Sequence, residues 1–182
     1  MMKKRVLAFA FALLLLLLSP LAWEVARAEE TLVALSAATV EGVSGEEVDV
    51  SLTLAECEAV DSLQFHLNYD ATALKPVRVT AGSVFPAEYC VTNLAEPGRV
   101  RAACASAEGV SAEDSGTLMI ITFSVLSGTG SALSFSDVVV TRVDSEYNQT
   151  RAYLSVTDGG VTVGGAALPA PVTTPWVAET PV

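Results

Sequence analysis

Residues 62–69 constrain the fold more than any other segment, because apolar and polar side chains alternate there without a break. The run SLQFHLNY places four apolar residues at odd positions and four polar residues at even positions. Successive side chains of a β-strand point to opposite faces of a sheet, so a period of two residues is typical of a strand. The segment therefore predicts a strand with one face in a core and one face in solvent.

The same alternation recurs in other segments, namely residues 48–54, 118–125 and 133–136, the last of which continues into 138–140. Glycines and prolines that favour turns lie between the runs, as at Pro97-Gly98. About eight or nine short strands in roughly 135 residues are typical of an all-β sandwich. We therefore predict a two-sheet antiparallel β-sandwich that forms one domain, residues 29–165.

The first 28 residues have the three parts of a secretory signal peptide. Three basic residues at positions 3–5 precede an apolar run at 6–18 with six consecutive leucines, and Ala26-Arg27-Ala28 supplies a cleavage site. The run of about 13 residues is shorter than the roughly 20 that span a bilayer as a helix. We predict bacterial export, cleavage after Ala28 and a secreted product without membrane contact, with a retained anchor as the alternative.

The composition changes after Gly164-Gly165. Residues 166–182 contain four prolines and three threonines, a density that favours an extended, semi-rigid segment. We predict a tail or linker there. Either it is a tail, or the chain is a fragment of a longer scaffold.

Net charge narrows the choice of partner. Removal of residues 1–28 takes away four basic and one acidic side chain, which changes the formal net charge from -11 to -14. Such a surface repels phosphate groups, so nucleic acid and anionic lipid are poor partners. The charge suits an extracellular protein and is compatible with cationic or calcium-bearing partners.

Three cysteines, Cys57, Cys90 and Cys104, allow at most one internal disulfide. Cys90 and Cys104 flank the predicted turn at 95–98, so a bridge across a hairpin is geometrically possible. Cys57 with Cys104 is the competing pair if their strands are neighbours. A chain without any disulfide is the third possibility.

Catalytic and metal-binding patterns are not apparent. His66 is the only histidine and occupies an outward strand position, and no serine lies in a nucleophile-elbow motif. Acidic pairs such as Glu46-Glu47 lie in predicted turns, without an apolar cleft to raise the pKa of one carboxyl. We predict that the protein is not an enzyme and needs no cofactor, with any calcium mainly on its partner.

Four segments, in this order, resemble the cohesin family, the receptor modules with which bacterial scaffold proteins of the cellulosome type capture dockerin-tagged enzymes. They are residues 43–52, 63–74, 116–125 and 158–163. The resemblance spans residues 31–163. It implies a nine-stranded jelly-roll sandwich in which one flat sheet face is the dockerin platform.

The resemblance places the platform on the outward residues of the strand at 62–69, which are Ser62, Gln64, His66 and Asn68. Arg101 and Ala103 on a neighbouring strand would join the same face. Many dockerin-binding cohesins carry asparagine and aspartate where this chain has Ser62 and Gln64, which points to a divergent partner or another role. The alternative is that these polar side chains only solvate a sheet.

The leading hypothesis is a secreted adaptor that docks dockerin-type partners during extracellular polysaccharide degradation. A carbohydrate-binding module is the rival, and a structural or adhesion domain of the cell envelope is a third hypothesis. Sugar-binding sandwiches usually display coplanar aromatic side chains. Four aromatic residues of this chain are predicted to point inward, namely Phe65, Tyr69, Phe123 and Phe135, which leaves Phe85, Tyr89, Tyr147, Tyr153 and Trp176 as possible sugar contacts.

Overall fold

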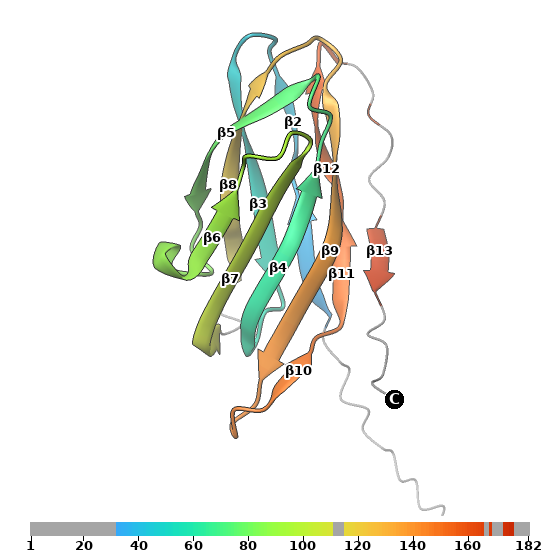
Figure 1. The fold of residues 1–182 in the computed structure, drawn as a ribbon. Helices are drawn as coiled ribbons and strands as arrows, with labels where there is room; N and C mark the ends of the chain where they lie inside the picture. Colours follow the sequence, from blue (N-terminus) through green and yellow to red (C-terminus); the bar gives the residue numbers. More distant parts are fainter. Residues whose placement is uncertain (1–31, 111–114, 166–167, 169–172, 177–182) are drawn as a thin grey trace, which may run out of the picture. The chain divides into compact units, whose positions relative to one another are not determined.

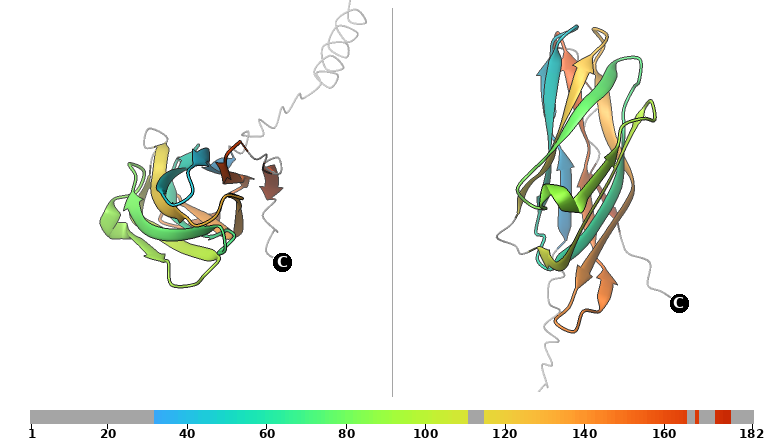
Figure 2. Two further views of the ribbon diagram at one scale, coloured as in Figure 1. Left: turned by 90° about the horizontal axis from the view of Figure 1, so that it is seen from above. Right: turned by 60° about the vertical axis from the view of Figure 1, so that its left-hand side comes forward.

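The computed structural model describes residues 32–110, 115–165, 168 and 173–176. The predicted signal peptide at 1–28 lies outside the described residues. Two sheets lie face to face, with β6, β7, β4 and β9 in the front layer of Figure 1 and β3 and β8 behind them (Figures 1 and 2). An all-β sandwich with two sheets is therefore confirmed.

The first sheet has six strands, in the order β13 (Thr173–Trp176), β11 (Leu154–Thr157), β1 (Val33–Ala37), β3 (Glu47–Ala55), β8 (Gly116–Val125) and β5 (Leu74–Ala81). The second sheet has seven strands. Six follow the order β2 (Thr39–Gly42), β12 (Gly159–Val163), β9 (Ser131–Val143), β4 (Val60–Asn68), β7 (Arg99–Val110) and β6 (Cys90–Asn93), and β10 (Gln149–Arg151) pairs with β9. A single 3-10 turn, η1 (Ala87–Tyr89), precedes β6.

The prediction of about nine antiparallel strands differs from the structure in count and in direction. The described residues form 13 strands, and two pairs are parallel, β1 with β11 and β2 with β12. The parallel pairs and two of the additional strands arise because the first and last long strands each cross from one sheet to the other, and β10 and β13 are further short strands. β1 and β2 are separated only by Ala38, and β11 and β12 only by Asp158.

Close backbone approach at this crossing requires a glycine. A Cβ atom on Gly159 would lie 2.5 Å from the carbonyl oxygens of both Ala37 and Ala38. Gly160 N–H donates a hydrogen bond to the Ala38 carbonyl oxygen at 3.2 Å. The Gly159-Gly160 pair, a turn or bulge signal in the sequence, is thus the point where the two end strands pass each other.

The core lies between the sheets and follows the period of two predicted from the sequence. In β4, Leu63, Phe65 and Leu67 are buried, whereas Gln64 is exposed and His66 half-buried. The alternation in β3 buries Val50, Leu52 and Leu54 against them. Burial of apolar surface drives the two sheets together, at about 25 cal/mol for each Å² removed from water.

A short strand lies within the segment that the sequence predicts as a tail. β13 pairs antiparallel with β11, and Pro175 lies opposite Ser155. Since β13 is at the edge of its sheet, a proline without a backbone N–H is compatible with this position. Figure 1 shows β13 beside β11.

The structure joins Cys90 of β6 to Cys104 of β7 in a disulfide, at directly paired positions of the two strands. Cys57 is buried, and its Sγ lies 3.4 Å from Ser115 Oγ. The competing pair, Cys57 with Cys104, is therefore not the one that forms. Among the described residues, no helix is long and apolar enough to cross a membrane.

Candidate protein-binding face

All six residues predicted for the platform lie on the solvent side of strands β9, β4, β7 and β6, which we call the outer face. Antiparallel pairing sets Gln64 opposite Ala103 and His66 opposite Arg101. Ser62 and Asn68 lie at the two ends of the same row on β4. The structure therefore brings together residues that are up to about 40 positions apart in the sequence.

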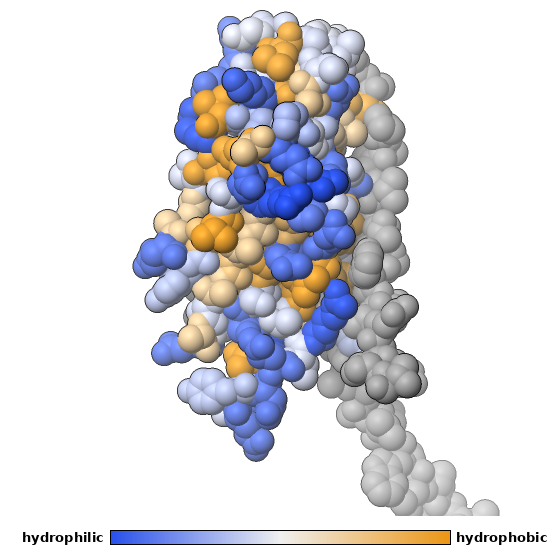
Figure 3. Space-filling model, viewed as in Figure 1, coloured by the Kyte–Doolittle hydropathy of each residue, from blue (hydrophilic) through white to orange (hydrophobic). Residues whose placement is uncertain are grey.

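The middle of the outer face is apolar. Val91 of β6 lies opposite Ala103, and Val139 of β9 lies opposite Gln64. Val91 is 69% exposed and Tyr89, at the end of η1, is 53% exposed. Orange and tan residues over the front sheet mark this region in Figure 3, with blue polar residues around them. Few polar contacts restrict the centre, which suits it to hydrophobic anchors of a partner.

Three hollows follow β7 across the outer face and form what we call the furrow. One of about 320 Å³ lies at the Arg101 and His66 end. The second shares Gln64, Val91 and Ala103 with it. The third, near β10, shares Ser62, Tyr89 and Ala105 with the second. Alanine side chains at alternate positions of β7 leave this space between larger neighbours.

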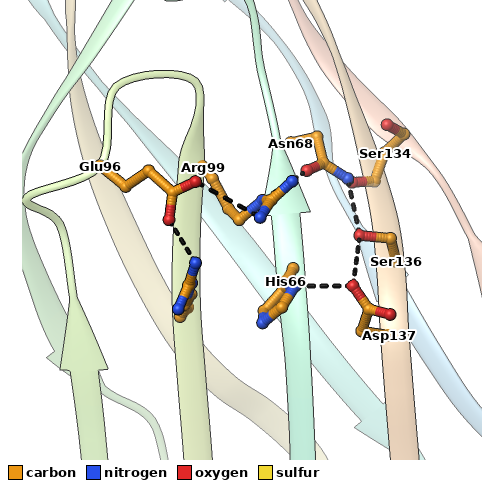
Figure 4. Close-up of polar contacts among 8 residues, drawn as sticks. His66, Asn68, Glu96, Arg99, Ser134, Ser136 and Asp137 are labelled. Atoms are coloured by element: carbon orange, nitrogen blue, oxygen red, sulfur yellow. Dashed lines mark hydrogen bonds and ion pairs between the residues drawn. The ribbon is translucent and has the colours of Figure 1, made fainter.

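A chain of polar contacts crosses the outer face beside the Arg101 end of the furrow (Figure 4). Glu96 forms ion pairs with Arg99 at 3.3 Å and with Arg101 at 2.5 Å. Arg99 Nε donates to Asn68 Oδ1 at 3.3 Å. Asn68 Nδ2 in turn donates to the carbonyl oxygen of Ser134 at 3.2 Å and to Ser136 Oγ at 3.0 Å. These contacts link three strands and fix the outward rotamers before any partner arrives.

We expect Asn68→Ala to lower the free energy of unfolding by about 1–3 kcal/mol, because it leaves half-buried polar groups on β7 and β9 without their partner. Urea denaturation measures the change. Thr92→Ala, at an exposed position of β6, is the control and should change stability by less than about 0.5 kcal/mol. Equal effects of the two substitutions would mean that the contacts of Asn68 are replaced by water at no cost.

Asp137 belongs to this face, and the sequence reading missed it. Its Oδ2 lies 2.8 Å from His66 Nδ1, and its backbone has a φ of +51°. The ladder between β4 and β9 shifts register here, because Gln64 pairs with Val139 but His66 pairs with Ser136. Such a β-bulge turns an extra side chain toward one face. The sequence contains a sign of this bulge, because the apolar residues that point inward change from odd positions, 133 and 135, to even positions, 138 and 140.

Two carboxyl groups on loops have a lowered pKa, and neither lies in a catalytic setting. The Thr72 hydroxyl and then the Thr72 backbone N–H stabilise the Asp70 carboxylate and lower its pKa. The side-chain amide and the backbone N–H of Asn148 do the same for Asp144. Asp70 thus caps its turn. Within the described ranges, no three His, Cys, Asp or Glu side chains cluster as metal ligands would.

The aromatic residues do not form an exposed strip on the described surface. Phe65 and Phe123 are buried as predicted, and Phe135 and Tyr69 pack against the core. The interpretation of Phe85 as a possible sugar contact is wrong, because its side chain is fully buried. Tyr89 and Tyr147 remain exposed, on η1 and on the turn between β9 and β10.

Comparison with known proteins agrees with this geometry. The model of the cohesin domain family matches residues 33–163. No curated protein sequence matches the chain.

Solved cohesins share the fold. The seventh ScaB type I cohesin of Pseudobacteroides cellulosolvens is 23% identical with a TM-score of 0.67, over 76% of this chain and 95% of its own. The sixth cohesin of scaffoldin B from Acetivibrio cellulolyticus, solved in complex with a dockerin, is 26% identical with a TM-score of 0.62, over 73% and 99%. A non-cellulosomal cohesin of the archaeon Archaeoglobus fulgidus is 19% identical with a TM-score of 0.62, over 72% and 91%.

The family model covers well over half of the chain, and the strands that it spans include every strand of the outer face. Cohesin domains are non-catalytic protein-binding modules. The chain belongs to the cohesin family.

Proposed function

We propose that the outer face of this cohesin domain binds a dockerin-type module of a secreted protein. The observation that carries the proposal is the furrow, which combines an apolar centre with polar side chains already held in place at one end. A helix laid along such a furrow would bury a few apolar anchors and meet fixed hydrogen-bonding groups at the rim. Several similar cohesins were solved in complex with dockerins, which supports the choice of partner.

The neutral centre of the furrow distinguishes this domain from the family pattern of asparagine and aspartate. Ser62 and Gln64 carry no charge, and the Ser62 hydroxyl is engaged with Thr141 Oγ1 at 2.6 Å. A partner would therefore meet a neutral amide and small apolar groups at the centre of the contact. We infer that the partner itself is apolar or neutral there, because an unpaired charge buried against Gln64 would lose its hydration without compensation.

Export and an extracellular role in polysaccharide degradation complete the proposal. The predicted signal peptide at residues 1–28 and the acidic composition support export. The protein would act without catalysis, by holding enzymes at high local concentration on their substrate. Amino-terminal sequencing of the secreted protein tests the export step and is expected to start at Glu29.

The binding proposal is tested by a pull-down of the secreted proteins of the source organism on the immobilised protein, with and without a calcium chelator. The expected result is calcium-dependent capture of proteins that share a duplicated calcium-loop module. Capture of no such protein, together with retention of the domain on insoluble polysaccharide, would overturn the proposal in favour of a carbohydrate-binding role.

Gln64→Lys should weaken binding of the captured partner at least 30-fold without lowering stability. Gln64 is exposed at the centre of the furrow, and a charge there would be desolvated in the complex, an effect of about 2 kcal/mol or more at a central position. Calorimetric titration measures the affinity. Thr80→Lys, at an exposed position of β5 in the other sheet, is the matched control and should bind as the unmodified protein does. Unchanged binding by Gln64→Lys would show that the interface does not lie on the outer face.

A further inference from the structure

The end of the furrow near β10 differs in charge from the rest of the outer face. This hollow of about 530 Å³ is lined by residues of β4, η1, β7 and β10, and two of them, Asp61 and Glu108, are acidic. None of the residues that line it is basic. We call it the acidic hollow.

Asp61 is unusual because its carboxylate is buried on the rim of an open hollow. The residue is only 5% exposed and lies where the pairing of β4 with both β7 and β9 shifts register. Its Oδ1 accepts a hydrogen bond from Thr141 Oγ1 at 2.7 Å, and its Oδ2 accepts one from Gln149 Nε2. A carboxylate has about four acceptor positions, so two remain for a further donor.

Both side chains that donate hydrogen bonds to Asp61, Thr141 and Gln149, are neutral. Neither Asp61 nor Glu108 forms an ion pair with another residue of the described part of the chain. The opposite end of the furrow differs, since Glu96 there forms an ion pair with Arg101 at 2.5 Å. A buried charge is unfavourable until an opposite charge joins it, and a charge-assisted hydrogen bond is about twice as strong as a neutral one.

The remaining walls suit the aliphatic part of a basic side chain. Tyr89 is 53% exposed and lines the hollow together with Ala105 and Ala107. A tyrosine ring attracts a cation that lies over its face, and small apolar side chains can cover the methylene groups of lysine or arginine.

We propose that the acidic hollow binds a lysine or arginine side chain of the partner protein. The identity of the partner rests on the proposed function, whereas the chemistry of the hollow does not.

The test is an NMR titration of the isotope-labelled protein with N-acetyl-arginine amide, with N-acetyl-citrulline amide as the uncharged probe of nearly the same shape. We expect saturable shifts at the backbone amides of 105–108 and Gln149 with the arginine probe in the millimolar range. The citrulline probe should bind at least ten times more weakly. Equal shifts with both probes, or shifts confined to other regions, would overturn the proposal.

Two variants test whether the carboxylates of Asp61 and Glu108 bind the arginine probe. Glu108→Gln, at an exposed position, should weaken arginine binding several-fold without affecting folding. Asp61→Asn should weaken arginine binding further. We expect this variant to fold, because the side-chain amide of Gln149 can rotate so that its oxygen accepts a hydrogen bond from the new N–H group. Glu41→Gln, on β2 at the far edge of the same sheet, removes the same charge and should bind as the unmodified protein does. Binding that survives both hollow variants contradicts the proposal, whatever the pull-down shows about dockerins.

Discussion

Phe65→Ala is expected to lower the free energy of unfolding by about 3–5 kcal/mol, the range observed when a buried aromatic ring leaves a cavity. Phe65 is 1% exposed in the middle of β4, and its ring meets that of Phe135 edge to face with 5.5 Å between centroids. Small domains have total stabilities of about 5–15 kcal/mol. The substitution therefore removes a large part of the stability of this domain.

Urea denaturation followed by circular dichroism measures the loss as a lower midpoint with an unchanged slope. Gln64→Ala is the matched control, because it is the neighbouring residue of the same strand and points to the opposite face. It should change stability by no more than about 0.5 kcal/mol. A loss below about 1 kcal/mol for Phe65→Ala would show that the alternation in β4 does not determine which face forms the core.

The second large effect is expected from removal of the disulfide in the double variant Cys90→Ala/Cys104→Ala. The bond closes a loop with a sequence separation of 14, and closure of a loop of about 15 residues restricts the unfolded chain by about 3 kcal/mol. The native state also depends on the bond locally. β6 pairs with β7 at only four positions, and η1 buries none of its side chains.

Because Val91 of β6 lines the furrow, loss of the disulfide should also weaken partner binding. The measurement is again the denaturation midpoint, together with hydrogen exchange of the β6 amides. A reductant should lower the stability of the unmodified protein to that of the double variant and should leave the double variant unchanged. A difference below about 1 kcal/mol between oxidised and reduced protein would mean that backbone pairing alone holds β6.

Most residues of the outer face were predictable from the local alternation of apolar and polar side chains. The residues that were not predictable lie where the register shifts or where an element is short. Alternation in β4 identifies Ser62, Gln64, His66 and Asn68 as outward, because a strand has only two faces. The antiparallel pairing of β7 with β4 places Arg101 and Ala103 beside them. The sequence did not place Val91 on this face, and it indicated Tyr89 only as a possible sugar contact, because η1 and β6 are too short to show a period.

Asp137 and Asp61 show what a sequence pattern conceals. Each lies at a register shift of β4 with its neighbours, where extra residues change which side chains face outward. The interruption of the alternation in β9 could have indicated the position of Asp137. Nothing in the sequence indicates that Asp61 is buried with only neutral hydrogen-bond donors. That environment is formed by Thr141 and Gln149, which lie about 80 or more residues away.

The sequence by itself determined the class of fold, the inward and outward faces of the long strands and the family, because all three depend on local alternation and on the order of segments along the chain. Only the tertiary structure decided the parallel pairing of the end strands, the disulfide and the furrow. These depend on contacts between residues far apart in the chain, such as the crossing of Gly159 with Ala37 and Ala38. Such contacts are selected by the packing of the two sheets as a whole, which no local segment encodes.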